Sequence, residues 1–111
     1  MKNSTTIIFE KPPVITFGAS VGGNEESKGP MAEYFDKLYT DPYLGEESWE
    51  KAESRMQFNT VTFLLEKSGL KQKDISLMIG GDLINQCTSS YFAARQLTPQ
   101  HTVFDRADIL L

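Results

Sequence analysis

The amino-acid sequence predicts an α/β fold, and three of its segments carry the prediction. A long segment over residues 46–68 repeats apolar residues at helical spacing. The short apolar run at 77–81 is bounded by a carboxylate and glycines, which is typical of a buried strand. A second helix-like segment follows at 89–97. Helices that alternate with shorter strands are typical of the α/β class.

Two strands are expected before the first helix. Residues 5–9, TTIIF, are β-branched and aromatic, and a pair of prolines ends the segment. Residues 14–20, VITFGAS, predict a second strand. The residues that follow, 21–30, are rich in glycine and predict a loop.

The remaining elements are predicted as helices. Residues 31–39 space four apolar residues as a short amphipathic helix would. The long helix over 46–68 has no capping box at its start, whereas Gly69 fits the left-handed residue that ends many helices. The helix at 89–97 has a serine as its expected cap. Three aromatic residues are expected to pack in the core: Tyr34, Phe35 and Trp49.

Composition excludes several classes of function. The chain has 111 residues, a net charge of −4 and a pI near 4.9, so it lacks the basic surface that nucleic-acid binding requires. No apolar run approaches the length of a membrane span. One cysteine and one histidine cannot make a structural zinc site, and no glycine pattern matches a nucleotide-binding loop. We therefore expect no metal, no cofactor and no nucleic-acid partner.

The stretch IGGDLINQC at 79–87 holds the candidate site residues. Asp82 follows the predicted strand, and Asn85 and Gln86 lie shortly after it, at the edge of the sheet where α/β proteins bind ligands. The ordinary role of such residues is to satisfy backbone groups in a turn, and that interpretation is favoured. Cys87 precedes a helix whose dipole favours a thiolate. We nevertheless interpret it as a packing residue and predict no catalytic residue in this chain.

Several separated blocks resemble known proteins. Residues 63–86, FLLEKSGLKQKDISLMIGGDLINQ, resemble the N-terminal half of the thiolase-like superfamily, which includes the ketoacyl synthases. The sequence GDLINQ is similar, almost letter for letter, to the stage V sporulation protein AD family. Further blocks resemble that family in the same order: KGPMAEYFDKLYTD (28–41), SWEKAESRM (48–56) and SSYFAARQL (89–97). The resemblance covers roughly residues 7–97.

The resemblance implies how the chain is organised. Residues 1–97 would form the incomplete N-terminal half of a thiolase-like layered fold, with helices packed on a mixed or parallel sheet. Residues 98–111 are expected to be a divergent tail of the kind that truncation or a frameshift produces, although HTVF within it could form a strand. The superfamily's nucleophile elbow is not found in this sequence. An enzymatic role is therefore not expected.

The resemblance also implies a function. The family is expected to bind dipicolinic acid, as a component of the system that moves this compound into the spore and releases it at germination. Its members would be peripheral to the spore inner membrane, held there by spore membrane proteins of the same system, and could form homodimers. The chain on its own is expected to be inactive. Two alternatives stay open: a fragment of a thiolase-like acyltransferase, and a short interaction module that binds a homologue or a membrane partner.

Overall fold

Two helices and four short strands form the regular structure of the chain in the computed structural model, which describes residues 6–82, 87–99 and 101–106. Short 3-10 turns lie between some of them. In chain order the elements are β1 (Val21–Gly22), β2 (Lys37–Leu38), α1 (Trp49–Ser68), β3 (Leu77–Asp82), α2 (Thr88–Leu97) and β4 (His101–Arg106).

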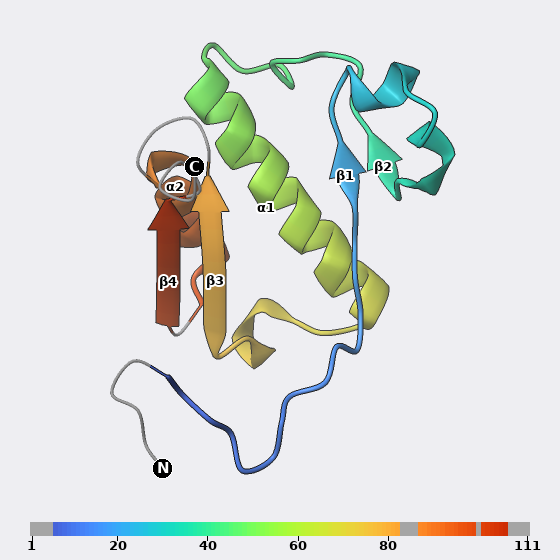
Figure 1. Cartoon of the computed structure of the whole chain (residues 1–111). Coiled ribbons are helices and arrows are strands. Elements are labelled where there is room, and N and C mark those ends of the chain that lie inside the picture. The colour runs from blue at the N-terminus through green and yellow to red at the C-terminus, as the bar shows by residue number, and fades with distance from the viewer. Residues whose placement is uncertain (1–5, 83–86, 100, 107–111) are drawn as a thin grey trace.

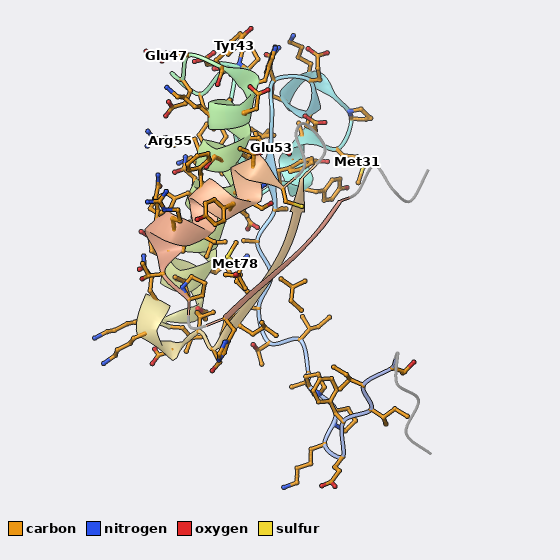
Figure 2. The ribbon with its side chains drawn as sticks, turned by 90° about the vertical axis from the view of Figure 1, so that its left-hand side faces the viewer. Met31, Tyr43, Glu47, Glu53, Arg55 and Met78 are labelled. Carbon is orange, nitrogen blue, oxygen red and sulfur yellow. The ribbon has the colours of Figure 1, made fainter. Side chains whose placement is uncertain are left out.

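The strands form two parallel pairs, which are seen to the left and to the right of α1 in Figure 1 and lie on the same side of this helix in the view of Figure 2. β3 and β4 pair along their whole length, from Leu77 opposite His101 to Asp82 opposite Arg106. α2 makes the crossover that a parallel connection requires. β1 and β2 form a shorter pair that begins with Val21 opposite Lys37. This arrangement of helices and parallel strands confirms the predicted α/β class.

α1 is delimited by its capping residues. The Ser48 side chain accepts a hydrogen bond from the Lys51 backbone N–H at 3.2 Å, so the helix begins after the first residues of the predicted range. Gly69 ends the helix in the left-handed conformation, with φ of 75°. Trp49, the first helical residue, stacks on Tyr43 with ring centroids 4.2 Å apart. Both rings lie at the surface, with Trp49 49% exposed, so the prediction of a core position for Trp49 is wrong.

Small residues let α1 and α2 approach closely. Ala52 of α1 is buried, and Ser89, Ser90 and Ala93 of α2 are fully inaccessible. The Ser89 hydroxyl donates a hydrogen bond to the Glu50 carbonyl at 3.1 Å, which ties the two helices together. α2 begins at Thr88, and its N-cap is Cys87, two or three residues before the predicted caps Ser89 and Ser90.

The two N-terminal strand predictions are wrong for the residues described. Residues 6–20 have no regular structure, and their large apolar side chains are exposed, with Ile15 at 97% and Ile7 at 83%. A strand is stabilised by its hydrogen-bonded neighbour rather than by its own sequence. These segments therefore have β propensity, but no neighbouring strand pairs with the residues described here.

The helix predicted at 31–39 is also wrong. A 3-10 turn over Ala32–Tyr34 is followed directly by β2. The backbone N–H groups of Asp36 and Lys37 donate to the Ser20 carbonyl at 3.0 and 3.2 Å, so these groups pair with the preceding segment instead of with a helical turn. Tyr34 is 69% exposed, so its predicted core position is wrong as well.

The predicted tail contains a strand. The HTVF sequence lies within β4, which spans His101–Arg106. The expectation that HTVF could form a strand is therefore confirmed. The boundary at Leu97 remains a prediction, and 107–111 lie outside the described residues. None of the helices in the described ranges is long and apolar enough to cross a membrane.

The left-handed backbone at Gly69 generates a stability prediction. We expect Gly69→Ala to lower the free energy of unfolding by about 1 kcal/mol, because a β-carbon is disfavoured at positive φ. Gly18→Ala is the matched control. A β-carbon meets nothing within 4 Å at either position, but Gly18 does not have the positive φ of Gly69. Urea unfolding followed by circular dichroism measures both, and equal effects of the two substitutions would contradict this account of the helix end.

Candidate functional site

One candidate site is a cleft between α1 and α2. Its volume is about 340 Å³. One wall is formed by the first half of α1 together with Glu46, which precedes the helix. The other wall is formed by α2. The lining residues are Glu46, Glu50, Lys51, Ser54, Arg55, Thr88, Phe92 and Gln96.

The charges of this cleft are compensated. Arg55 donates from Nε and Nη2 to one carboxylate oxygen of Glu46, at 2.8 and 2.6 Å. Lys51 donates from Nζ to Glu47 at 2.9 Å. This hydrogen bond, with the attraction between the charges, lowers the pKa of Glu47 and raises that of Lys51. Arg55 and Glu47 both lie on the outer side of α1 (Figure 2). Both basic residues of the cleft are thus already held by carboxylates.

The second hollow is an apolar groove of about 310 Å³ between Val21 and β3. α1 forms its floor, and Met78 lies on the side of β3 that faces this helix (Figure 2). The lining has no charged side chain: Val21, Met56, Gln57, Thr60, Val61, Met78, Ile79, Gly80 and Gly81. Such a groove suits apolar groups and offers no charge to an anion.

The predicted site residues fall at or beyond the end of β3. Asp82 is its last residue, opposite Arg106 of β4. It therefore lies at the carboxyl edge of the parallel pair, as predicted. Asn85 and Gln86 lie outside the described residues, so the grouping of these three residues into one site stays a prediction.

Cys87 is half-buried at the start of α2, and its own φ is 66°. His101, the only histidine, is exposed at the start of β4, beyond the other end of the same helix. A helix of ten residues is about 15 Å long. The thiol and the imidazole are therefore at opposite ends of α2. Among the described residues, no group of three or more His, Cys, Asp or Glu side chains could hold a metal ion.

Sequence reasoning missed a polar cluster around Asp36. One carboxylate oxygen accepts from the Ser20 backbone N–H at 2.8 Å, and the other accepts from Lys67 Nζ at 2.9 Å. These bonds, chiefly the one from the Ser20 backbone, lower the pKa of Asp36 below its ordinary value of 3.8. Lys67 lies 31 residues away along the chain. No local pattern could have indicated this contact.

Comparison with known proteins places this α/β chain among the sporulation proteins. The family model described as stage V sporulation protein AD (SpoVAD) matches residues 3–106. The chain is also 35% identical over 92 residues to the stage V sporulation protein AD of Bacillus subtilis (strain 168). The chain belongs to the stage V sporulation protein AD family, which confirms the resemblance seen in its sequence blocks.

The matches cover most of this chain but only part of the relative. The match to the Bacillus subtilis protein covers 83% of this chain and 27% of that protein. The family match runs past Leu97 to residue 106 and so includes β4. The chain therefore spans about a quarter of the length of this relative.

The lowered pKa of Asp36 generates a pH prediction. A carboxylate whose pKa is lower in the folded state stabilises the fold above its unfolded pKa, and the contribution is lost as the pH falls through the folded value. Asp36→Asn should therefore destabilise the chain at neutral pH, and its difference from the parent should shrink as the pH falls below 3.8. Urea unfolding across this pH range measures the effect.

Glu47→Gln is the matched control, because it removes an exposed ion pair with Lys51 rather than a hydrogen bond to the backbone. Its effect on stability should be the smaller of the two. A loss in Asp36→Asn that stays constant across the acidic range would contradict the role assigned to the carboxylate.

Proposed function

We propose that this chain serves in the spore dipicolinate system, as part of a dipicolinate-binding component of the stage V sporulation protein AD type. The single observation that carries the proposal is membership of the family, from a match over residues 3–106. A thiolase-like layered fold for the longer protein belongs to the same proposal. So do peripheral attachment at the spore inner membrane through membrane partners and dimer formation.

The chemistry of the ligand indicates what a binding site must contain. Dipicolinate is a planar dicarboxylate, so its site should offer cations, backbone N–H donors and a flat apolar wall. The cleft between α1 and α2 has the wall in Phe92, but Arg55 is held by Glu46. The groove beside β3 has apolar walls and no cation. We therefore propose that a complete site requires residues beyond those of this chain.

A role without catalysis is part of the proposal. Acyl transfer by a cysteine needs a general base within hydrogen-bond reach of the thiol. Cys87 and His101 lie at opposite ends of α2, which argues against this pair as nucleophile and base. The alternative of an acyltransferase fragment is supported only by the position of Cys87 at the helix N-terminus. Labelling of Cys87 by an acyl-coenzyme A, absent in Cys87→Ser, would favour that alternative.

Titration with dipicolinate tests the proposal. We expect the isolated chain to show no binding at micromolar dipicolinate in isothermal titration calorimetry, because its cleft cations are engaged by carboxylates. The full-length Bacillus subtilis relative is the positive control. Binding by the relative alone supports both parts of the proposal. Failure of the relative to bind contradicts the proposed function, and micromolar binding by the chain contradicts the claim that its site is incomplete.

Glu46→Gln sharpens this experiment, because it removes the carboxylate that holds Arg55. If the cleft were a dipicolinate site limited only by this ion pair, the variant would gain affinity. We expect no measurable gain.

A further inference from the structure

The ion pairs of the cleft between α1 and α2 compensate its two cations but leave one carboxylate over. Arg55 is paired with Glu46. Lys51 is paired with Glu47. Glu50 lines the same cleft and is half-buried, and its carboxylate has no hydrogen-bond or ion-pair partner within the described ranges. An ionised carboxylate only accepts hydrogen bonds, so the Glu50 oxygens can receive the N–H groups of a cation that enters the cleft.

The position of Glu50 on α1 explains its charge but does not use its hydrogen-bonding capacity. Glu50 is in the first turn of the helix, where the helix dipole stabilises a negative charge. Its backbone carbonyl accepts the Ser89 hydroxyl at 3.1 Å, which ties this end of α1 to α2. The carboxylate is therefore carried by a fixed element beside the cleft, and an incoming cation would displace no existing bond.

The opposite wall favours a planar cation. Thr88, Phe92 and Gln96 are spaced four residues apart, so they form one line along α2 beside the cleft. The Phe92 ring is 49% exposed. A guanidinium group can stack on such a ring while its N–H groups donate to a carboxylate and to an amide oxygen, whereas an ammonium group has no plane to stack. The cleft therefore suits arginine better than lysine.

The surroundings of the cleft are those of a protein interface rather than of a small-molecule pocket. Phe92 is the only apolar residue of the lining, and small-molecule pockets are lined mainly by apolar side chains. Beside it, Tyr91 is 55% exposed, and the two rings meet edge to face at 5.9 Å. Arg95 lies over the Tyr91 ring and is not part of the cleft lining. Exposed aromatic residues next to a pocket for arginine are typical of the centre of an interface.

We propose that the cleft between α1 and α2 binds an arginine side chain of a protein partner. The guanidinium stacks on Phe92 and donates to the Glu50 carboxylate, and Tyr91 contacts an apolar residue next to the arginine. The net charge of −4 attracts a basic segment over a longer distance. This inference concerns a surface that offers no free cation to dipicolinate, and it does not depend on the proposed function.

Titration with three blocked peptides tests the chemistry of the ligand. Acetyl-leucyl-arginyl-leucine amide is added to the full chain, and its lysine and citrulline counterparts are the controls. Lysine has the charge without the plane, and citrulline has the plane without the charge. The arginine peptide should shift the amide resonances of Glu50 and Phe92 saturably. The lysine peptide should bind about threefold more weakly, and the citrulline peptide should not bind.

Two results of this titration would overturn the proposal. One is binding of the lysine or the citrulline peptide as tight as that of the arginine peptide. The other is the absence of a saturable shift at millimolar concentrations of the arginine peptide.

Glu50→Gln tests the residue assigned to the guanidinium, and Glu33→Gln is its matched control. Both substitutions remove one negative charge, but Glu33 is exposed in the 3-10 turn over Ala32–Tyr34 and is not part of the cleft. Glu50→Gln should weaken binding of the arginine peptide by about tenfold, because a charge-assisted hydrogen bond is lost. Glu33→Gln should leave the affinity unchanged. Circular dichroism shows that both variants are folded, and equal affinities of the two would contradict the assignment of Glu50.

Acetyl-arginine amide separates a protein partner from a small guanidinium compound. It has the same cation as the peptide but no neighbouring apolar residue to contact Tyr91. The peptide should therefore bind about threefold more tightly than acetyl-arginine amide. Equal affinities would show that the cleft takes a small guanidinium compound, and that result would overturn the assignment of a protein partner.

Discussion

The contacts of Asp36 are the constraint on which the N-terminal half of the structure depends. This one carboxylate holds the Ser20 backbone N–H and the Lys67 ammonium at 2.8 and 2.9 Å. Asp36, which directly precedes β2, is thereby joined to Ser20, which directly precedes β1, and to Lys67 in the last turn of α1. β1 and β2 are only two residues long each, too short to fix their own position by backbone pairing. The charged contact of Asp36 with Lys67, together with the hydrogen bond that Asn59 of α1 donates to the Tyr39 hydroxyl at 2.9 Å, therefore ties this pair of strands to α1.

The C-terminal half is organised differently, by close contact between helices with small side chains. α1 and α2 are in contact, and several of their buried residues are small: Ala52 on α1, and Ser89, Ser90 and Ala93 on α2. Small side chains bury little apolar area, and so the helix pair gains little from the hydrophobic effect. Both helices lie on one side of β3 (Figures 1 and 2), and Leu77 and Ile79 are exposed on the other, at 49% and 73%. The described chain thus leaves apolar area uncovered that a complete layered fold would bury.

Prediction from the sequence succeeded where structure is determined locally. α1 and β3 have their boundaries in capping residues, glycines and apolar spacing, and those signals lie within the segments themselves. The segments at 5–9 and 14–20 have equally good β propensity, yet a strand also needs an edge to pair with, and no local signal says whether that edge is available. The helix expected at 31–39 failed for the same reason, because pairing with Ser20 determines its backbone.

In the candidate site, too, local signals predicted the position of a residue, whereas contacts between distant parts of the chain were not predicted. The place of Asp82 at the end of β3 follows from a local pattern, whereas the cleft between α1 and α2 brings together Arg55 and Phe92 from separate parts of the chain. Side chains that meet only through helix packing leave no mark in a single sequence. The ion pair of Arg55 with Glu46 instead joins α1 to the segment just before it, nine residues away along the chain, and it compensates the charge of Arg55 in the cleft.

The stacked pair of Trp49 and Tyr43 makes the chain's own fluorescence a local reporter. Trp49 is the only tryptophan, and its ring contacts a residue of the loop that leads into α1. Its emission will follow the fraying of that helix end and the opening of that loop. The opposite end of α1 and the edge of β3 contain no indole, so rearrangements there will be silent in tryptophan emission. Tryptophan emission will therefore report on the start of α1, and its transition need not coincide with that of a probe that follows the whole backbone.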